Sequence, residues 1–173
     1  MFGLFGFGRA STLYFQMTPQ FVIARDVDTQ RQWSDSPYIA LSRCGHIKAI
    51  GSLALRFDAD FNDYIVCMNP FDVEEGVEAI LMSAILEQGM KQVHRGFLRP
   101  NVILHPLESD ASKWKLSEMR CWQKLAHRSD GVKTYVWTGR VLLDVEARQQ
   151  NFPLDSGTLA YTCEYDLRKK LSS

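Results

Sequence analysis

The residues that come nearest to a catalytic arrangement are Cys44-Gly45-His46, which set a thiol beside an imidazole. A cysteine nucleophile needs its histidine base in direct contact, and the two usually come from distant segments. Gly45 is typical of a tight turn between two strands, which explains the tripeptide without catalysis. We therefore predict no catalytic residues, and an enzyme with scattered catalytic residues around Cys44 and His46 is the second alternative.

Metal and cofactor chemistry finds little support in the sequence. Asp58, Asp60 and Asn62 match positions 1, 3 and 5 of a calcium-binding loop, but Asp63 replaces its glycine and Asn69 replaces its bidentate glutamate. The four histidines and four cysteines show no zinc-ligand spacing, and no phosphate-binding glycine motif occurs. We predict no metal site and no cofactor.

The charges are unevenly distributed, although the formal net charge is zero. Residues 1–90 hold 6 Lys and Arg against 11 Asp and Glu, whereas residues 91–173 hold 14 against 9. The two halves either neutralise each other by packing together or present surfaces of opposite sign to partners. In the second case the acidic tract would bind a protein through Asp58, Asp60, Asp63, Glu74, Glu75 and Glu78.

The basic segment between residues 91 and 128 offers a different kind of site. Lysines and arginines can contact phosphates, and tryptophans can stack on bases. No sequence pattern of a known nucleic-acid-binding module accompanies them. Nucleic-acid binding is therefore the alternative hypothesis, with these contacts: Arg95, Arg99, Lys113, Lys115, Arg120, Trp122, Lys124 and Arg128.

These residues must be positioned by a fold that contains both strands and helices. Short runs rich in β-branched and aliphatic residues predict several strands before residue 69. Asn69-Pro70, an acidic first turn and apolar residues at helical spacing predict one long helix over about 70–95. Residues 110–127 are ambiguous, because a helical face competes with the hairpin signal of Asp130-Gly131.

The last third of the chain shows alternating apolar residues typical of strands with one buried face. The first run extends from Tyr135 to Val145 and the second begins at Leu159. On this pattern Val141, Leu143 and Val145 belong to the core. We predict an α+β fold: an antiparallel sheet, including a long C-terminal strand pair, packed against the helix at 70–95 and a possible second helix at 110–127.

The whole chain fits a single domain over residues 17–173. Residues 1–16 form a flexible apolar leader in this interpretation, and the sequence LYFQM resembles the end of a protease site used to remove purification tags. The leader lacks the basic start of a signal peptide, and no apolar run is long enough for a membrane span. Four widely spaced cysteines favour a reducing cytoplasm.

The combined observations predict a binding protein. We expect a non-enzymatic domain that binds another macromolecule, with a protein as the first choice of partner, in an adaptor, inhibitory or regulatory role. Neither a membrane nor a cofactor is expected to take part. The oligomeric state does not follow from the sequence.

Overall fold

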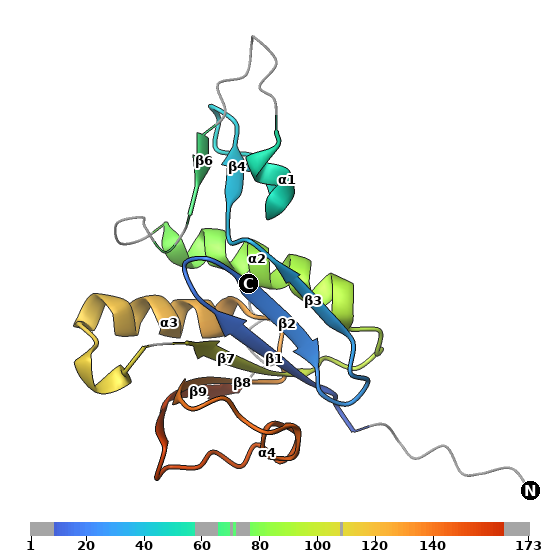
Figure 1. Cartoon of the computed structure of the whole chain (residues 1–173), viewed down its shortest axis with the longest axis vertical. Coiled ribbons are helices and arrows are strands. Elements are labelled where there is room, and N and C mark those ends of the chain that lie inside the picture. Colours follow the sequence, from blue (N-terminus) through green and yellow to red (C-terminus); the bar gives the residue numbers. More distant parts are fainter. Residues whose placement is uncertain (1–8, 58–65, 70, 72–76, 108, 165–173) are drawn as a thin grey trace, which may run out of the picture.

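The computed structural model describes residues 9–57, 66–69, 71, 77–107 and 109–164. It contains a six-stranded sheet in the order β3-β2-β1-β7-β8-β9 and a three-stranded sheet in the order β5-β4-β6 (Figure 1). The strands are β1 (Thr12–Met17), β2 (Val22–Asp26), β3 (Gln32–Asp35), β4 (Ile39–Leu41), β5 (Ile47–Ile50), β6 (Val66–Met68), β7 (Asn101–Pro106), β8 (Lys133–Gly139) and β9 (Gly157–Glu164). The α-helices are α1 (Ser52–Leu55), α2 (Glu78–Val93), α3 (Leu116–Arg128) and α4 (Asp144–Gln149), and a 3-10 turn spans Ala111–Lys113.

The main sheet is mixed, so the prediction of an antiparallel sheet is wrong. β1 pairs with β7 in parallel, and β7 pairs with β8 in parallel. The outer strands β2, β3 and β9 run antiparallel to their neighbours. Parallel neighbours need a crossover connection, and α3 lies in the chain between β7 and β8. Asp130-Gly131 suggested a hairpin, and a hairpin would make the strands on either side of it antiparallel, so the sequence did not indicate this crossover.

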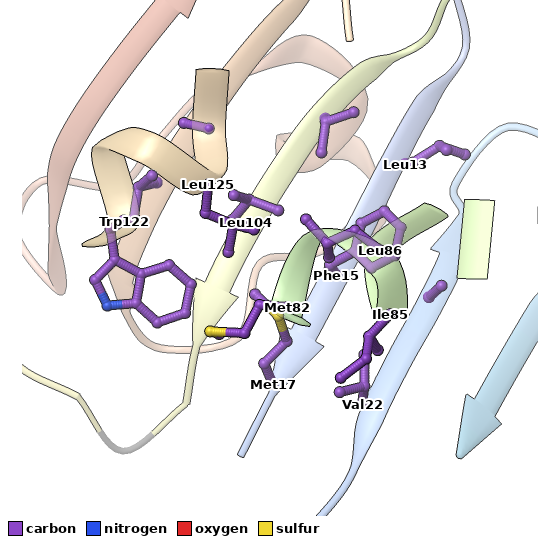
Figure 2. Close-up of a cluster of buried hydrophobic side chains, with 14 of the residues drawn as sticks. Leu13, Phe15, Met17, Val22, Met82, Ile85, Leu86, Leu104, Trp122 and Leu125 are labelled. Atoms are coloured by element: carbon purple, nitrogen blue, oxygen red, sulfur yellow. The ribbon is translucent and has the colours of Figure 1, made fainter. Parts of the chain in front are cut away.

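Helices α2 and α3 cover one face of the main sheet (Figure 1). Each fully buried aliphatic or aromatic side chain between the two layers stabilises the fold by about 1.5–3 kcal/mol. Figure 2 shows the side chains that join these layers: Leu13, Phe15, Met17, Val22, Met82, Ile85, Leu86, Leu104, Trp122 and Leu125.

Helix α2 lies within the range predicted for a long helix, but it begins at Glu78 and ends at Val93. Residues 70 and 72–76, which the prediction included, lie outside the described residues. Gly89 does not end the helix early. A Cβ atom at this position would lie 3.0 Å from Phe15, Ala24 and Trp33, so the glycine allows α2 to pack closely on the sheet.

Residues 116–128 form a helix, which settles the ambiguity between a helix and a strand. The backbone amide of Lys115 donates a hydrogen bond to Oε2 of Glu118 (2.7 Å), which closes the first turn. His127 and Arg128 in the last turn complement the negative end of the helix dipole. The element that precedes β8 in the chain is therefore a helix and not the first strand of a hairpin.

The predicted long strand from Tyr135 to Val145 is interrupted. β8 ends at Gly139, which has φ 143°, and α4 follows it. Glu146 accepts a hydrogen bond from the backbone amide of Leu143 (2.8 Å), and this bond caps α4. Val141, Leu143 and Val145 are about half exposed, so the prediction that they belong to the core is wrong.

The opposite face of the sheet carries a smaller core next to α4 (Figure 1). Tyr14, Ile103 and Trp137 are buried there, and Leu142 and Ala147 belong to the same cluster. Because Tyr14 belongs to β1, the predicted leader of residues 1–16 overlaps a central strand of the domain. Residues 1–8 lie outside the described residues.

The three-stranded sheet stands beside the main sheet and extends beyond α2 (Figure 1). β4 pairs antiparallel with β5 and with β6. Ile39 of β4 reaches into the core beneath α2, which joins the two sheets. In the described part of the chain, no helix is both long and apolar enough to cross a membrane.

Candidate functional site

The carboxyl ends of β1, β7 and β8 meet at one edge of the main sheet, where open sheets of this kind usually bind ligands. In the turn after β1, the backbone amides form hydrogen bonds within the turn itself. Thr18 donates its backbone amide to the carbonyl of Phe21 (2.9 Å), and its hydroxyl accepts the amides of Gln20 and Phe21 (3.1 Å each). Pro19 has no amide hydrogen. The turn therefore offers no unpaired backbone donor to an anion.

A buried hydrogen-bond network lies below the same edge. The hydroxyl of Tyr14 donates to Nδ1 of His105 (2.6 Å) and accepts the amide of Leu142 (3.1 Å). Nε2 of His105 donates to the carbonyl of Gly139 (3.1 Å). Burial lowers the pKa of His105 to about 4 and raises the pKa of Tyr14 to about 12, so both groups are neutral at pH 7. The network connects β1, β7 and β8 and has a structural role.

A cavity of about 170 Å³ lies between the first turns of α2 and α3. Three large side chains, Phe71, Met82 and Trp122, give it an apolar lining. Trp122 is only 8% exposed, and its ring stacks on Trp114 at 6.0 Å between centroids. Apolar surface that stays open beside polar groups is a usual feature of a binding site.

Two carboxylates belong to the same cavity. Glu78 is the first residue of α2, and Glu118 lies in the first turn of α3. The thiol of Cys121 lies next to them; burial, followed by the charge of Glu78, raises its pKa to about 11. Cys121 therefore stays protonated, and the cavity holds two carboxylates beside aromatic rings.

A larger cavity of about 550 Å³ lies at the other end of the helix pair, where α2 and α3 finish. Leu86 and Met90 give it apolar surface, and charged and polar side chains surround them. These polar residues are Ser83, Glu87, Lys91, His94, Arg128, Ser129 and Asp130. The two cavities therefore differ in charge and in size.

The structure places only one of the predicted acidic binding residues. Glu78 lines the smaller cavity. The other five, Asp58, Asp60, Asp63, Glu74 and Glu75, lie outside the described residues. The acidic tract of the sequence thus contributes one carboxylate to a described cavity, and Glu118 of the basic half contributes another.

The structure does not gather the predicted nucleic-acid contacts into one open surface. Trp122 is only 8% exposed and stacks on Trp114 in the lining of the smaller cavity. Arg99 pairs with Asp130 (3.2 Å), and Lys113 pairs with Asp110 (3.3 Å).

The remaining predicted contacts of this set are exposed: Arg95, Lys115, Arg120, Lys124 and Arg128. Arg128 alone lines one of the two cavities.

Cys44 and His46 lie at the turn between β4 and β5, where Gly45 has φ 78°. Both side chains are exposed, and the backbone amide of His46 donates to the hydroxyl of Ser42 (3.1 Å). All four cysteines are free thiols. Among the described residues, no three His, Cys, Asp or Glu side chains come together as metal ligands.

Sequence reasoning missed Glu118, Cys121 and Phe71 as neighbours of Glu78. Glu118 and Cys121 lie about 40 residues from Glu78 in the chain, and the ambiguity of residues 110–127 left open which face of α3 would meet α2. No capping signature in the sequence marks the start of α3, because Lys115 stands where a capping box has Ser, Thr, Asp or Asn.

No family model matches the chain, and no curated protein matches it. Among solved structures, the crystal structure of MreB 5 of Spiroplasma citri bound to AMPPNP is similar to it, with a TM-score of 0.52 and 12% sequence identity. The match covers 70% of this chain and 37% of the MreB chain. At this identity the likeness concerns the fold alone. The mixed sheet is similar to an actin/MreB-like fold, which again corrects the predicted antiparallel sheet.

Proposed function

We propose that the chain is a non-enzymatic protein-binding domain that accepts a lysine or arginine side chain of its partner in the cavity between α2 and α3. The observation that supports this proposal is the combination of Glu78 and Glu118 with an aromatic lining in one cavity. Two carboxylates attract a cation, and an aromatic ring beside them adds a cation–π contribution.

The size of the cavity supports a side chain as the ligand. About 170 Å³ holds one extended side chain, whereas small-molecule sites usually span about 300–1,000 Å³. Arginine fits the chemistry well, because its planar guanidinium can bind a carboxylate through two hydrogen bonds while its stem contacts apolar groups. Glu118 uses Oε2 to cap α3, and its Oε1 has no partner among the described residues.

A nucleotide is the second candidate ligand, because the similar MreB structure is bound to AMPPNP. In an open sheet it would lie beyond the carboxyl ends of the parallel strands. The occupied amides of residues 18–21 do not favour phosphate binding there. Calorimetric titration with AMPPNP and Mg²⁺ tests this candidate, and a saturable heat would establish it independently of the cavity.

The protein-binding proposal can be tested with short labelled peptides that contain either arginine or citrulline at their centre. Citrulline keeps the shape of arginine and removes its charge. Fluorescence anisotropy should show saturable binding of the arginine peptides and weaker binding of the citrulline peptides. Replacing Glu78→Gln or Glu118→Gln should weaken the arginine complex by about tenfold, because each removes a charge-assisted contact.

Glu87→Gln is the matched control, because Glu87 is an exposed glutamate of α2 that lies outside this cavity. The Glu118→Gln variant keeps a side-chain oxygen that can accept the amide of Lys115, so the cap on α3 is retained. Equal affinity for arginine and citrulline peptides, or equal losses in Glu87→Gln and Glu118→Gln, would contradict the proposal.

A further inference from the structure

The larger cavity, at the ends of α2 and α3, contains polar side chains that nearly all have partners within the protein. Ser83 donates to the carbonyl of Ile80 (2.6 Å). Glu87 accepts from Lys91 (2.6 Å). On the α2 side of the cavity, the hydroxyl hydrogen of Ser83 is therefore engaged, and Glu87 and Lys91 are paired with each other.

The polar side chains on the other sides of the larger cavity also have partners within the protein. Nε2 of His94 donates to the carbonyl of Leu98 (3.0 Å), which leaves Nδ1 to accept the hydroxyl of Ser11 (3.2 Å). Ser129 donates to the carbonyl of Ala126 (2.8 Å). Asp130 pairs with Arg99, as described above.

Arg128 is the exception among the polar residues of this cavity. It is the last residue of α3, its side chain is exposed, and among the described residues it has neither an ion pair nor a hydrogen bond through its side chain. The guanidinium carries five donors and stays charged at all accessible pH values. The cavity therefore combines apolar surface from Leu86 and Met90 with a positive charge that has no ion-pair partner among the described residues.

We propose that this cavity binds a small amphipathic anion, with the anionic head group on Arg128 and an apolar chain against Leu86 and Met90. The volume of about 550 Å³ falls within the range of small-molecule sites. Each of the acids at its rim has a cationic partner: Glu87 pairs with Lys91, and Asp130 pairs with Arg99. This inference is independent of the proposed recognition of a basic side chain at the other cavity.

Octanoate is a suitable probe, because it has a carboxylate head and an eight-carbon chain. Acetate has the head without the chain, and octylamine has the chain with a positive head. Titrations can be followed through the methyl NMR signal of Met90, with that of Met82 in the smaller cavity as an internal reference. We expect octanoate to shift the Met90 signal saturably, and acetate and octylamine to leave it nearly unchanged.

Arg128→Gln should weaken octanoate binding by about tenfold, because it removes the charge-assisted contact. Arg120→Gln is the matched control: Arg120 is an exposed arginine of the same helix and lies outside both cavities. Unchanged octanoate affinity in Arg128→Gln, an equal response to octylamine, or no saturable shift of Met90 would overturn the proposal.

Discussion

The hydroxyl of Tyr14 lies 2.6 Å from Nδ1 of His105, and both side chains are fully buried. Because Nε2 of His105 donates to the carbonyl of Gly139, Nδ1 carries no hydrogen and accepts from Tyr14. The hydroxyl in turn accepts the amide of Leu142. One hydroxyl thus satisfies two buried groups that would otherwise lack partners.

Tyr14→Phe should therefore destabilise the protein by about 2–4 kcal/mol. The change leaves Nδ1 of His105 and the amide of Leu142 without partners, and each unsatisfied buried group costs about 1–3 kcal/mol. Urea denaturation monitored by circular dichroism gives the free energy of unfolding. Tyr161→Phe is the control, since the hydroxyl of Tyr161 bonds to His127 at an exposed position. Equal losses in the two variants would contradict this account.

The stability should fall as the pH decreases from about 6.5 to about 4. The pKa of His105 is lowered to about 4 in the folded state, against about 6.5 in the unfolded chain, so the unfolded state binds the extra proton. The contribution of His105 is fully present above pH 6.5, and about 3 kcal/mol of it is lost by pH 4. Denaturation curves at several pH values measure this dependence, and His105→Gln should flatten it. The same slope in the variant would assign the dependence to other groups.

Gly157→Ala should destabilise the pair formed by β8 and β9. A Cβ atom at this position would overlap with the carbonyl oxygen of Thr138 and the ring of Trp137, which is fully buried. The strands would have to separate, and overpacking of this kind costs about 1–3 kcal/mol or more. Thermal denaturation should show a clear decrease in Tm. Thr158→Ala, at an exposed position of the same strand, should have a much smaller effect.

The four thiols should differ in their reactivity. Cys44 is exposed, whereas the pKa of Cys121 is raised to about 11 by burial and by Glu78. At pH 8 a thiol of pKa about 11 is ionised in only about one molecule in a thousand, and the thiolate is the form that reacts. Mass spectrometry after brief treatment with iodoacetamide should find Cys44 alkylated long before Cys121. Rapid alkylation of Cys121 in the folded protein would show that its environment differs from the one described.

The sequence predicts the helices better than the sheet. Apolar residues recur at helical spacing between Val77 and Ile85, and this pattern depends on local geometry alone. Strand direction depends on distant pairings: β1 lies beside β7, although about 90 residues separate them in the chain. No local pattern encodes whether such a pair is parallel or antiparallel.

The alternation beyond Gly139 was misleading for a different reason. Val141, Leu143 and Val145 continue the period of β8, but Gly139 turns the chain and Glu146 caps α4. Only part of the candidate site could be predicted from the sequence. Glu78 belongs to the acidic tract that the sequence singles out, whereas its neighbour Glu118 depends on how α2 and α3 pack.

The proposed function requires the cavity between α2 and α3 to bind a basic side chain. Its most direct test is a titration with N-acetyl-arginine methylamide, followed through the indole NMR signal of Trp122, which lines the cavity. We expect a saturable shift that N-acetyl-citrulline methylamide does not produce, and we expect Glu118→Gln to weaken the binding by about tenfold. A Trp122 signal that is unchanged by the arginine compound, or equally shifted by both compounds, would contradict it.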